Sequence, residues 1–362
     1  MNKMILPTNE VGFKPSEKNT WFNESEYINF LGLNPGENYL YPSEIYENLE
    51  NDKIVTLSFK AAIEINTETF LDKIVLDINS GIGLNSLFAC KYGAAKVYSI
   101  EPNKTKSKIA KKIIRDNHYE NVIKCINIDI YNLKLKEKVD IIICNWMGNF
   151  LLQNSYIKQV IYARNNFLTK NGLIFPNKAI LYMCGIEDNE YKSQKLNSWD
   201  NIYGIDMNCI EIESIKSPLI ESFHKNSIIS SICPIFCVDL YNIKERDLNF
   251  SNSYELNFVK KDYCSAFACW FDVEFSHLPN QIKFTTGPFN SSTKWNQTIF
   301  YIPDNYLVNK GDKVNGSICC TENIKLNELS GLNIKLSFNF ERKINNGEIK
   351  INNGIQLYKI NS

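Results

Sequence analysis

The sequence predicts an α/β domain with a doubly wound parallel sheet, followed by an antiparallel β-barrel or sandwich. Between residues 52 and 175, short apolar runs rich in β-branched residues alternate with helical patterns, which is typical of parallel strands joined by helices. After Phe175-Pro176, apolar and polar residues alternate in segments separated by turn residues, which is typical of antiparallel strands. A chain of 362 residues is long enough for two such domains, each with its own core.

The first half predicts its elements in a regular order. Short buried strands of mostly Val and Ile are expected at residues 74–78, 96–100 and 139–144. A helix should follow the first of these strands and end at Gly93, because glycine adopts the left-handed backbone that commonly closes helices. A basic amphipathic helix is expected from Lys104 to Asn117. The order strand, helix, strand, helix, strand predicts the doubly wound sheet.

The second half predicts strands joined by turns. Alternating segments are expected to pair at residues 253–259, 267–275 and 332–340, and a more polar insertion occupies about 188–218. Near the end of the chain, residues 343–347 are echoed by residues 350–354, and both contain Asn-Gly. Asn-Gly between alternating apolar residues is typical of a tight hairpin turn, so two such turns are predicted.

The composition of the sequence limits the kinds of partner and the cellular environment that can be expected. Lys plus Arg is 40 and Asp plus Glu is 40, so bulk charge does not favour nucleic acid or a membrane surface as a direct partner. No stretch reaches the roughly 18 uninterrupted apolar residues of a membrane span. The eleven cysteines are scattered and often lie in apolar runs, which predicts reduced thiols in a cytoplasmic or nuclear protein. No metal site is expected from their spacing.

A ligand-type loop follows the strand expected at residues 74–78. Asp77-Ile-Asn-Ser-Gly81-Ile-Gly83 joins this strand to a helix, where glycines let a ligand approach backbone N–H groups. Glu101 lies 18 residues after Gly83, at the end of the next strand, a position suited to both hydroxyls of a ribose. The alternative is a tight turn with a solvent-facing glutamate. Without a third glycine, the loop is more similar to an adenosylmethionine site than to a nicotinamide site.

Four further segments carry a more specific resemblance. They are Asn145-Trp-Met-Gly148, residues 165–176, Trp199 to Met207, and Ser292-Thr-Lys-Trp295. In order and spacing, from about residue 52 to the end of the chain, the sequence resembles the protein arginine N-methyltransferase family. That resemblance implies a Rossmann-like adenosylmethionine-binding domain at residues 51–175, after a leader at 1–50. It also implies a β-barrel domain at 176–362, with a dimerisation arm at about 188–218.

The resemblance also implies roles for individual residues. The methionine end of S-adenosyl-L-methionine is expected on Asp77, Gly81 and Gly83, and its ribose on Glu101. Asp129 is expected to meet the adenine, although direct alignment puts Ile130 at the acidic position of the family. The segment from Trp199 to Met207 is expected to join two subunits head to tail.

The departures from the family pattern all fall on the predicted site. Asn145 and Asn154 stand where the family has two glutamates that grip the substrate guanidinium. Lys294 replaces a histidine, beside the retained Trp295. Three departures concern the cofactor: Val55 replaces an arginine, Asn79 replaces the first glycine of the loop, and a leader motif of paired aromatics is not recognisable. We therefore expect weak or absent binding of adenosylmethionine.

The loss of the two carboxylates bears directly on catalysis. Arginine and the sulfonium of adenosylmethionine are both cations, so methyl transfer needs anions beside the guanidinium. Two lost charge-assisted hydrogen bonds cost about 3–6 kcal/mol, on the order of a hundred- to ten-thousand-fold in rate. The sequence thus predicts a catalytically impaired subunit that dimerises with an active arginine methyltransferase and meets protein substrates through it. The alternatives are an active arginine methyltransferase and a methyltransferase that acts on a neutral amide or amino nitrogen.

Overall fold

The computed structural model describes residues 53–196, 199, 201–323, 331–343 and 349–361. These residues belong to one compact unit of the chain. The leader predicted at residues 1–50 lies outside the described residues.

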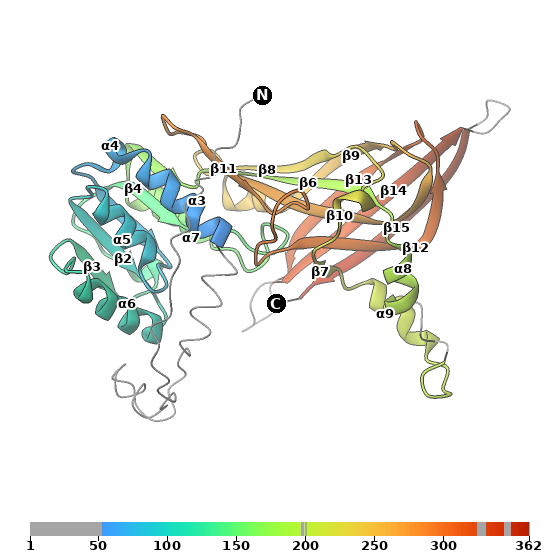
Figure 1. The fold of residues 1–362 in the computed structure, drawn as a ribbon, viewed down its shortest axis with the longest axis horizontal. Helices are drawn as coiled ribbons and strands as arrows, with labels where there is room; N and C mark the ends of the chain where they lie inside the picture. The colour runs from blue at the N-terminus through green and yellow to red at the C-terminus, as the bar shows by residue number, and fades with distance from the viewer. Residues whose placement is uncertain (1–52, 197–198, 200, 324–330, 344–348, 362) are drawn as a thin grey trace, which may run out of the picture. The chain divides into compact units, whose positions relative to one another are not determined.

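The first domain contains a parallel sheet with the strand order β3-β2-β1-β4-β5 (Figure 1). Its strands are β1 (Ile74–Ile78), β2 (Lys96–Ile100), β3 (Ile123–Ile126), β4 (Val139–Cys144) and β5 (Leu168–Phe175). All four strand pairings in this sheet are parallel. The predicted strands at 74–78, 96–100 and 139–144 are confirmed with these bounds. Their runs of Val, Ile and Leu are buried because helices cover the sheet.

The helices of this domain are α3 (Lys53–Glu64), α4 (Thr67–Phe70), α5 (Leu84–Lys91), α6 (Lys104–Asp116) and α7 (Ile157–Asn166). A short 3-10 helix, η1, spans Ile130–Asn132. The buried side of α6 includes Ile109, Ala110 and Ile114, as the amphipathic pattern predicts. Gly93 follows α5 with φ +101°, the left-handed backbone expected of a residue that closes a helix. No described helix has the length and apolarity to cross a membrane.

The second domain is a barrel-like arrangement of two antiparallel sheets. The larger sheet has the order β7-β12-β10-β6-β8, and β11 pairs with β10. Its strands are β6 (Lys178–Ile186), β7 (Leu219–Glu221), β8 (Cys233–Asp239), β10 (Asp262–Phe275), β11 (Ile282–Thr285) and β12 (Gln297–Val308). The smaller sheet has the order β15-β14-β13-β9. Its strands are β9 (Phe250–Asn257), β13 (Lys313–Asn323), β14 (Gly331–Lys343) and β15 (Ile349–Ile360). One buried apolar cluster is continuous through both domains.

One of the two predicted Asn-Gly turns is wrong. Asn353-Gly354 lies inside β15, where Gly354 pairs with Phe338 and Asn353 pairs with Asn339 of β14. A Cβ added to Gly354 would lie 2.5 Å from the ring of Phe338, so the glycine makes room for an aromatic side chain on the neighbouring strand. The pairing with β14 thus overrides the local turn signal. The other predicted turn, at 343–347, falls mostly on residues outside the described part of the chain.

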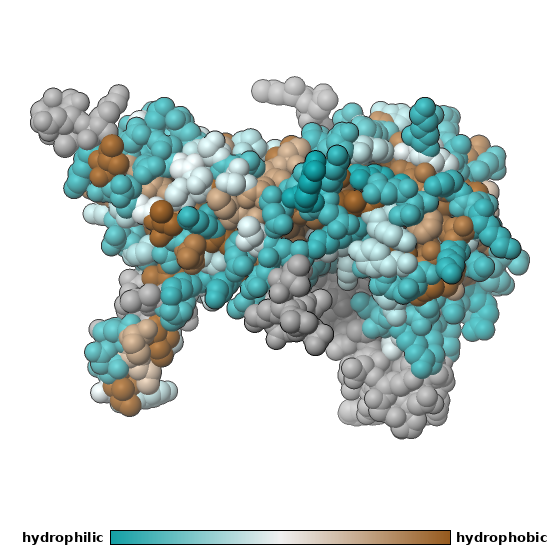
Figure 2. Space-filling model, turned by 180° about the vertical axis from the view of Figure 1, so that it is seen from behind, coloured by the Kyte–Doolittle hydropathy of each residue, from teal (hydrophilic) through white to brown (hydrophobic). Residues whose placement is uncertain are grey.

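A helical arm leaves the second domain between β6 and β7 (Figure 1). It contains α8 (Asn189–Tyr191), a π-helical turn η2 (Lys192–Leu196), η3 (Asn208–Ile210) and α9 (Glu211–Ile215). At its tip, Ile202 and Ile205 exchange backbone hydrogen bonds, with Tyr203 and Gly204 at positive φ between them. Tyr203 is fully exposed and Ile205 is 58% exposed. Apolar atoms appear on this arm at the lower left of the space-filling view (Figure 2).

Candidate cofactor and substrate site

The strand order places a crevice between β1 and β4. The chain proceeds from β1 to β2 and β3 on one side of the sheet, whereas β4 and β5 lie on the other side. Ligands of such folds bind outside the carboxyl ends of the strands where the order reverses. Ile78 at the end of β1 lies opposite Cys144 at the end of β4. The predicted cofactor loop follows Ile78 and the predicted substrate segment follows Cys144, so the sheet brings both to this crevice.

The loop between β1 and α5 turns tightly, as its glycines predict. Asn79, Gly81 and Gly83 adopt the left-handed backbone, with φ of +52°, +58° and +85°. Glycine reaches this region without strain and asparagine tolerates it better than most residues. A Cβ at Gly81 would meet no atom within 4 Å, so one side of the loop faces open space. This is the side on which a ligand could approach the backbone.

Glu101 supports the loop from the end of β2. Its Oε2 accepts the Gly81 N–H at 2.7 Å, and its Oε1 accepts the Asn103 N–H at 2.8 Å. Burial raises the pKa of this carboxyl, while the two backbone hydrogen bonds lower it. A carboxylate offers about four lone-pair positions, so each oxygen keeps one for a ribose hydroxyl. The geometry is compatible with the predicted ribose contact, and it adds a structural role in holding Gly81.

Asp77 is a buried structural carboxyl in this arrangement. It is 1% exposed, and its Oδ2 accepts a hydrogen bond from the Ser86 hydroxyl of α5 at 2.6 Å. Burial raises its pKa to about 7, and the hydrogen bonds from Ser86 act in the opposite direction. Asp77 therefore links β1 to the first turn of α5. Its predicted contact with the methionine end of a cofactor stays a prediction.

The crevice is crossed by a hydrogen bond between two side chains. The Asn79 Nδ2 donates to the Oε1 of Gln159, which lies in the first turn of α7. Val55, at the position of the family arginine, is 2% exposed in the apolar face of α3. The methionine end of adenosylmethionine carries a carboxylate and an ammonium. Among the described side chains expected at that end, Asn79 is bonded to Gln159, Val55 is buried, and Asp77 is buried against Ser86, so as arranged they do not fit this group.

The predicted adenine contact involves a residue that already caps a helix. Asp129 precedes η1, and its Oδ1 accepts the Tyr131 N–H at 2.9 Å. The neighbouring Ile130 is 2% exposed and belongs to the apolar core. The carboxylate of Asp129 is thus near the predicted place but turned toward its own backbone. Its contact with adenine stays a prediction.

The predicted substrate segment forms a tight hairpin between β4 and α7. Gly148 pairs with Leu151 and Asn149 pairs with Gln153. Phe150 and Leu151 occupy the turn at φ +48° and +66°, a strained backbone for bulky residues, and both are buried. The Phe150 ring packs edge-on against Phe300 of β12, with centroids 5.4 Å apart. Packing against the second domain therefore holds the strained turn in place.

The two asparagines that replace the family glutamates lie in different surroundings. The Oδ1 of Asn145 is buried and accepts no hydrogen bond within the described structure. Asn154 is exposed and left-handed, with φ +55°. Residues 145–154 include no Asp or Glu. The hairpin thus presents a neutral, unsatisfied acceptor at one position and a solvated amide at the other.

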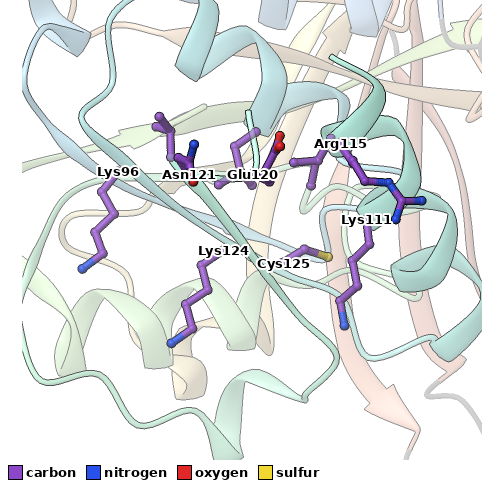
Figure 3. A pocket seen from close by; sticks show the side chains of 10 residues that line it. Lys96, Lys111, Arg115, Glu120, Asn121, Lys124 and Cys125 are labelled. Carbon is purple, nitrogen blue, oxygen red and sulfur yellow. The ribbon is translucent and has the colours of Figure 1, made fainter. Parts of the chain in front are cut away.

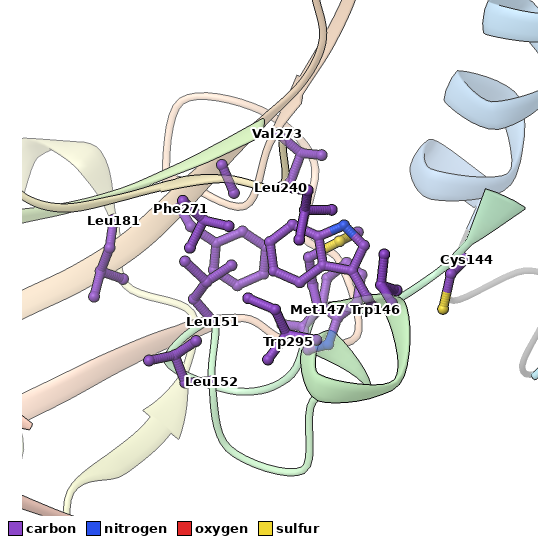
Figure 4. Packing of buried hydrophobic residues seen from close by; sticks show 14 of the residues in the cluster. Cys144, Trp146, Met147, Leu151, Leu152, Leu181, Leu240, Phe271, Val273 and Trp295 are labelled. Atoms are coloured by element: carbon purple, nitrogen blue, oxygen red, sulfur yellow. The ribbon is translucent and has the colours of Figure 1, made fainter. Parts of the chain in front are cut away.

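The base of the hairpin is anchored to the second domain. The Trp146 indole donates to the Pro176 carbonyl at 3.1 Å, and the Gln153 Nε2 donates to the Asn361 carbonyl at 2.6 Å. Trp295 is buried beside Met147 and Leu151, together with Phe271 and other side chains of the second domain (Figure 4). Trp295 thus packs the hairpin against the second domain, and its indole is largely inaccessible to a ligand.

Lys294 and Thr293 precede this tryptophan. Lys294 is exposed, and its Nζ lies 4.9 Å from the centre of the Trp295 ring. Thr293 is 3% exposed, and its hydroxyl has no hydrogen-bond partner within the described structure. The predicted role of Lys294 as a cation beside the site stays a prediction.

A pocket of about 510 Å³ lies away from the crevice, at the β3 edge of the parallel sheet. Lys111 and Arg115 of α6 line it together with Lys96 and Lys124 (Figure 3). Cationic side chains along a free edge strand discourage pairing with a further strand. Of these four cations, Lys124 alone lies in the edge strand β3, so edge protection accounts for that residue, whereas Lys96 of β2 pairs with Glu137.

Comparisons with known proteins decide the family. The chain is 38% identical to protein arginine N-methyltransferase 1 of Caenorhabditis elegans over 304 residues, which is 83% of this chain and 86% of that protein. The chain belongs to the protein arginine N-methyltransferase family. The relative of that name from Chlamydomonas reinhardtii is also 38% identical, over 84% of this chain and 88% of its own length.

Family models and solved structures agree with this assignment. Residues 177–343 match the arginine methyltransferase oligomerization subdomain, and residues 60–175 match the TRM5/TYW2 methyltransferase domain. A chain of the Trypanosoma brucei PRMT1 enzyme-prozyme heterotetrameric complex with AdoHcy superposes with a TM-score of 0.81 at 31% identity. The match covers 87% of this chain and 98% of that one. The predicted fold class is thereby confirmed: an adenosylmethionine-dependent methyltransferase fold followed by an antiparallel β-domain.

Sequence reasoning missed several residues of the candidate site. Gln159 is hydrogen-bonded to Asn79 although the two residues are 80 positions apart in the sequence, and Ser86 donates a hydrogen bond to Asp77. Gln153 ties the hairpin to the last described residue, Asn361. The serine at the start of α5 was the available signal, because a hydroxyl in a first helical turn can serve a buried acid. The two glutamines carried no such signal.

Proposed function

We propose that this chain is a catalytically impaired arginine methyltransferase homologue that acts as a regulatory subunit of an active family member. The observation that carries the proposal is the pair Asn145 and Asn154 on the hairpin between β4 and α7. One amide oxygen is buried without a donor, and the other residue is solvated. No carboxylate of the hairpin itself balances a guanidinium there.

The electrostatic reason is general. A guanidinium stays protonated at all relevant pH values, and an amide head presents donors as well as an acceptor to its donor fork. A charge-assisted hydrogen bond contributes about 1.5–3 kcal/mol, against about 0.5–1.5 kcal/mol for a neutral one. Replacing two charge-assisted hydrogen bonds by neutral ones weakens both the binding and the orientation of arginine. The hairpin is expected to keep its shape and its packing while losing most of its affinity for arginine.

The partner proposed for this subunit is an active arginine methyltransferase, bound through the arm. The arm exposes Tyr203, Ile205 and Ile210, and exposed apolar side chains at a projecting tip favour a protein contact. The oligomerization subdomain that matches residues 177–343 includes this arm. The Trypanosoma brucei assembly, described as an enzyme-prozyme heterotetramer, is a precedent for pairing an enzyme with a prozyme in this family. A homodimer through the same arm is the alternative arrangement.

Two other activities are competing proposals. An active arginine methyltransferase is favoured by the 38% identity to relatives that carry that name. A methyltransferase for a neutral amide or amino nitrogen is favoured by the unpartnered Oδ1 of Asn145, which can accept such an N–H. We further propose the cytoplasm or nucleus as its location, because all eleven cysteines are free.

The test is co-purification followed by methylation assays. Affinity-tagged protein is isolated from its own cells, its partners are identified, and methylation of a glycine-arginine-rich peptide is measured alone and with the recovered partner. We expect background turnover alone and a marked change in the partner's rate. Isolation of homodimers alone, or robust turnover by the purified chain that Glu101→Ala abolishes, would overturn the proposal. Turnover confined to peptides with neutral amide or amino acceptors would favour the neutral-nitrogen activity.

A further inference from the structure

The bond between Asn79 and Gln159 lies where the fold would place part of a ligand. Asn79 is the first residue after β1, and Gln159 lies in the first turn of α7, which follows β4 and its hairpin. The two strands are neighbours, and their last paired residues are Ile78 and Cys144. The side chains therefore meet across the mouth of the crevice between β1 and β4. A ligand portion lying between the loop and α7 must displace this contact.

The two ends of the crevice differ in how open they are. At the β2 side, Glu101 keeps lone pairs for hydroxyl donors, and Gly81 beside it, expected where the methionine end begins, faces open space. At the β4 side, the amide pair spans the gap and Val55 is buried in the apolar core. A ribose held by Glu101 directs the 5′ substituent of a nucleoside away from β2, toward the amide pair. The open end fits a nucleoside, and the closed end excludes a long charged tail.

We propose that the Asn79–Gln159 pair closes the methionine end of the methyl-donor crevice, so that the site favours thioadenosine nucleosides without an amino-acid tail over adenosylmethionine. This deepens the proposed function, because a subunit that does not methylate has no need of an open donor site. The closure is local and reversible. The amino-acid tail binds only the fraction of molecules in which the hydrogen bond between Asn79 and Gln159 is broken. The apparent affinity for adenosylmethionine is reduced by that fraction.

The size of the effect on the affinity for adenosylmethionine follows from the strength of one neutral hydrogen bond. Such a bond contributes about 1 kcal/mol net, so removing it raises the open fraction about fivefold. Asn79→Gly and Gln159→Ala both remove the same bond, so their effects on affinity should not add. Asn79→Gly also puts glycine at φ +52°, which relieves the left-handed backbone and keeps the loop folded.

The experiment is calorimetry on the full chain with two probes, adenosylmethionine and 5′-methylthioadenosine. We expect the wild type to bind 5′-methylthioadenosine at least as tightly as adenosylmethionine. Asn79→Gly, Gln159→Ala and the double variant should each bind adenosylmethionine about fivefold tighter, with the affinity for 5′-methylthioadenosine unchanged. His118→Gly is the matched control, because His118 has φ +62° and is exposed just beyond α6. Thermal unfolding of every variant checks that the fold is retained.

Three results would overturn the proposal. One is a wild type that binds adenosylmethionine about ten times more tightly than 5′-methylthioadenosine, the reverse of the preference that a closed tail site imposes. Another is a set of variants whose affinity for adenosylmethionine equals that of the wild type or changes as it does in His118→Gly. The third is the absence of binding of either probe at millimolar concentration by any variant. All three concern ligand binding, whereas the regulatory role is judged by methylation and co-purification, so the two proposals fail separately.

Discussion

Asn145→Glu and Asn154→Glu restore carboxylates to the hairpin, and the structure predicts that they differ in their effect on stability. Asn154 is exposed, so a glutamate at this position stays hydrated. Its cost is that glutamate tolerates the left-handed backbone at φ +55° less well than asparagine does. That cost is about 1 kcal/mol of the free energy of unfolding. The Oδ1 of Asn145 is buried without a donor, so a carboxylate there loses water without gaining a partner. We expect Asn145→Glu to lower the free energy of unfolding by about 2–3 kcal/mol.

The same double substitution should increase affinity for arginine. A guanidinium between two carboxylates exchanges two neutral hydrogen bonds for charge-assisted ones, a gain of about 1–1.5 kcal/mol each, which corresponds to about thirty- to hundred-and-fifty-fold tighter binding. The bound guanidinium also offsets the destabilisation that Asn145→Glu causes, so the peptide should raise the melting temperature of the variant more than that of the wild type. The gain in affinity should fall as salt concentration rises.

The assays are chemical denaturation for stability and fluorescence anisotropy with a labelled glycine-arginine-rich peptide for binding. Asn149→Glu is the matched control, because it adds the same charge to the same hairpin at a position the family pattern does not assign to arginine. If Asn149→Glu improves binding as much as the double substitution, the effect is bulk charge. If the double substitution leaves peptide affinity unchanged, the hairpin does not face the guanidinium and the electrostatic reasoning fails.

Single residues carry three further predictions. Because the folded pKa of Asp77 is about 7, above its ordinary value of 3.8, its contribution to stability is present below pH 3.8 and is lost as pH rises toward 7. In denaturant titrations between about pH 4 and 7, the free energy of unfolding of Asp77→Asn should therefore increase relative to that of the wild type by about 1.4 kcal/mol per pH unit. Parallel pH profiles of the two proteins would contradict this. Gly148→Ala places a Cβ 1.8 Å from the Gln153 carbonyl oxygen and should lower the free energy of unfolding by about 3 kcal/mol, whereas a loss below about 1 kcal/mol would show that the hairpin adapts. Ile205→Asp, on the exposed tip of the arm, should leave the circular dichroism spectrum unchanged and dissociate the subunits in sedimentation velocity, and an intact dimer would remove the arm from the interface.

The sequence alone determined the elements whose signals are local. Strands at 74–78, 96–100 and 139–144 and the helix from Lys104 follow from the periods of their apolar residues. The glycine loop after β1 follows from spacing, because a tight turn into a helix needs left-handed residues close together. The family likewise follows from short motifs in a fixed order. These signals depend on residues a few positions apart, which is why they are readable without a structure.

Where tertiary contacts compete with a local signal, the local signal fails. Asn353-Gly354 has the composition of a hairpin turn, yet it continues β15 because each of its residues pairs with β14. The buried ring of Phe338 covers Gly354 and accounts for the glycine. The free energy of a long paired strand exceeds the turn preference of two residues. No pattern within residues 350–354 contains that information.

The state of the candidate site was decided only by the tertiary structure. The Asn79–Gln159 bond joins residues 80 positions apart, and the Gln153–Asn361 bond joins residues 208 positions apart. Neither pair has a sequence signature, because the strand order and the packing of two domains determine which amides meet. The sequence showed that the carboxylates of the family are missing at Asn145 and Asn154. Only the fold shows that one amide oxygen is buried without a donor and that two other amides span the crevice, since burial and distance belong to the folded chain.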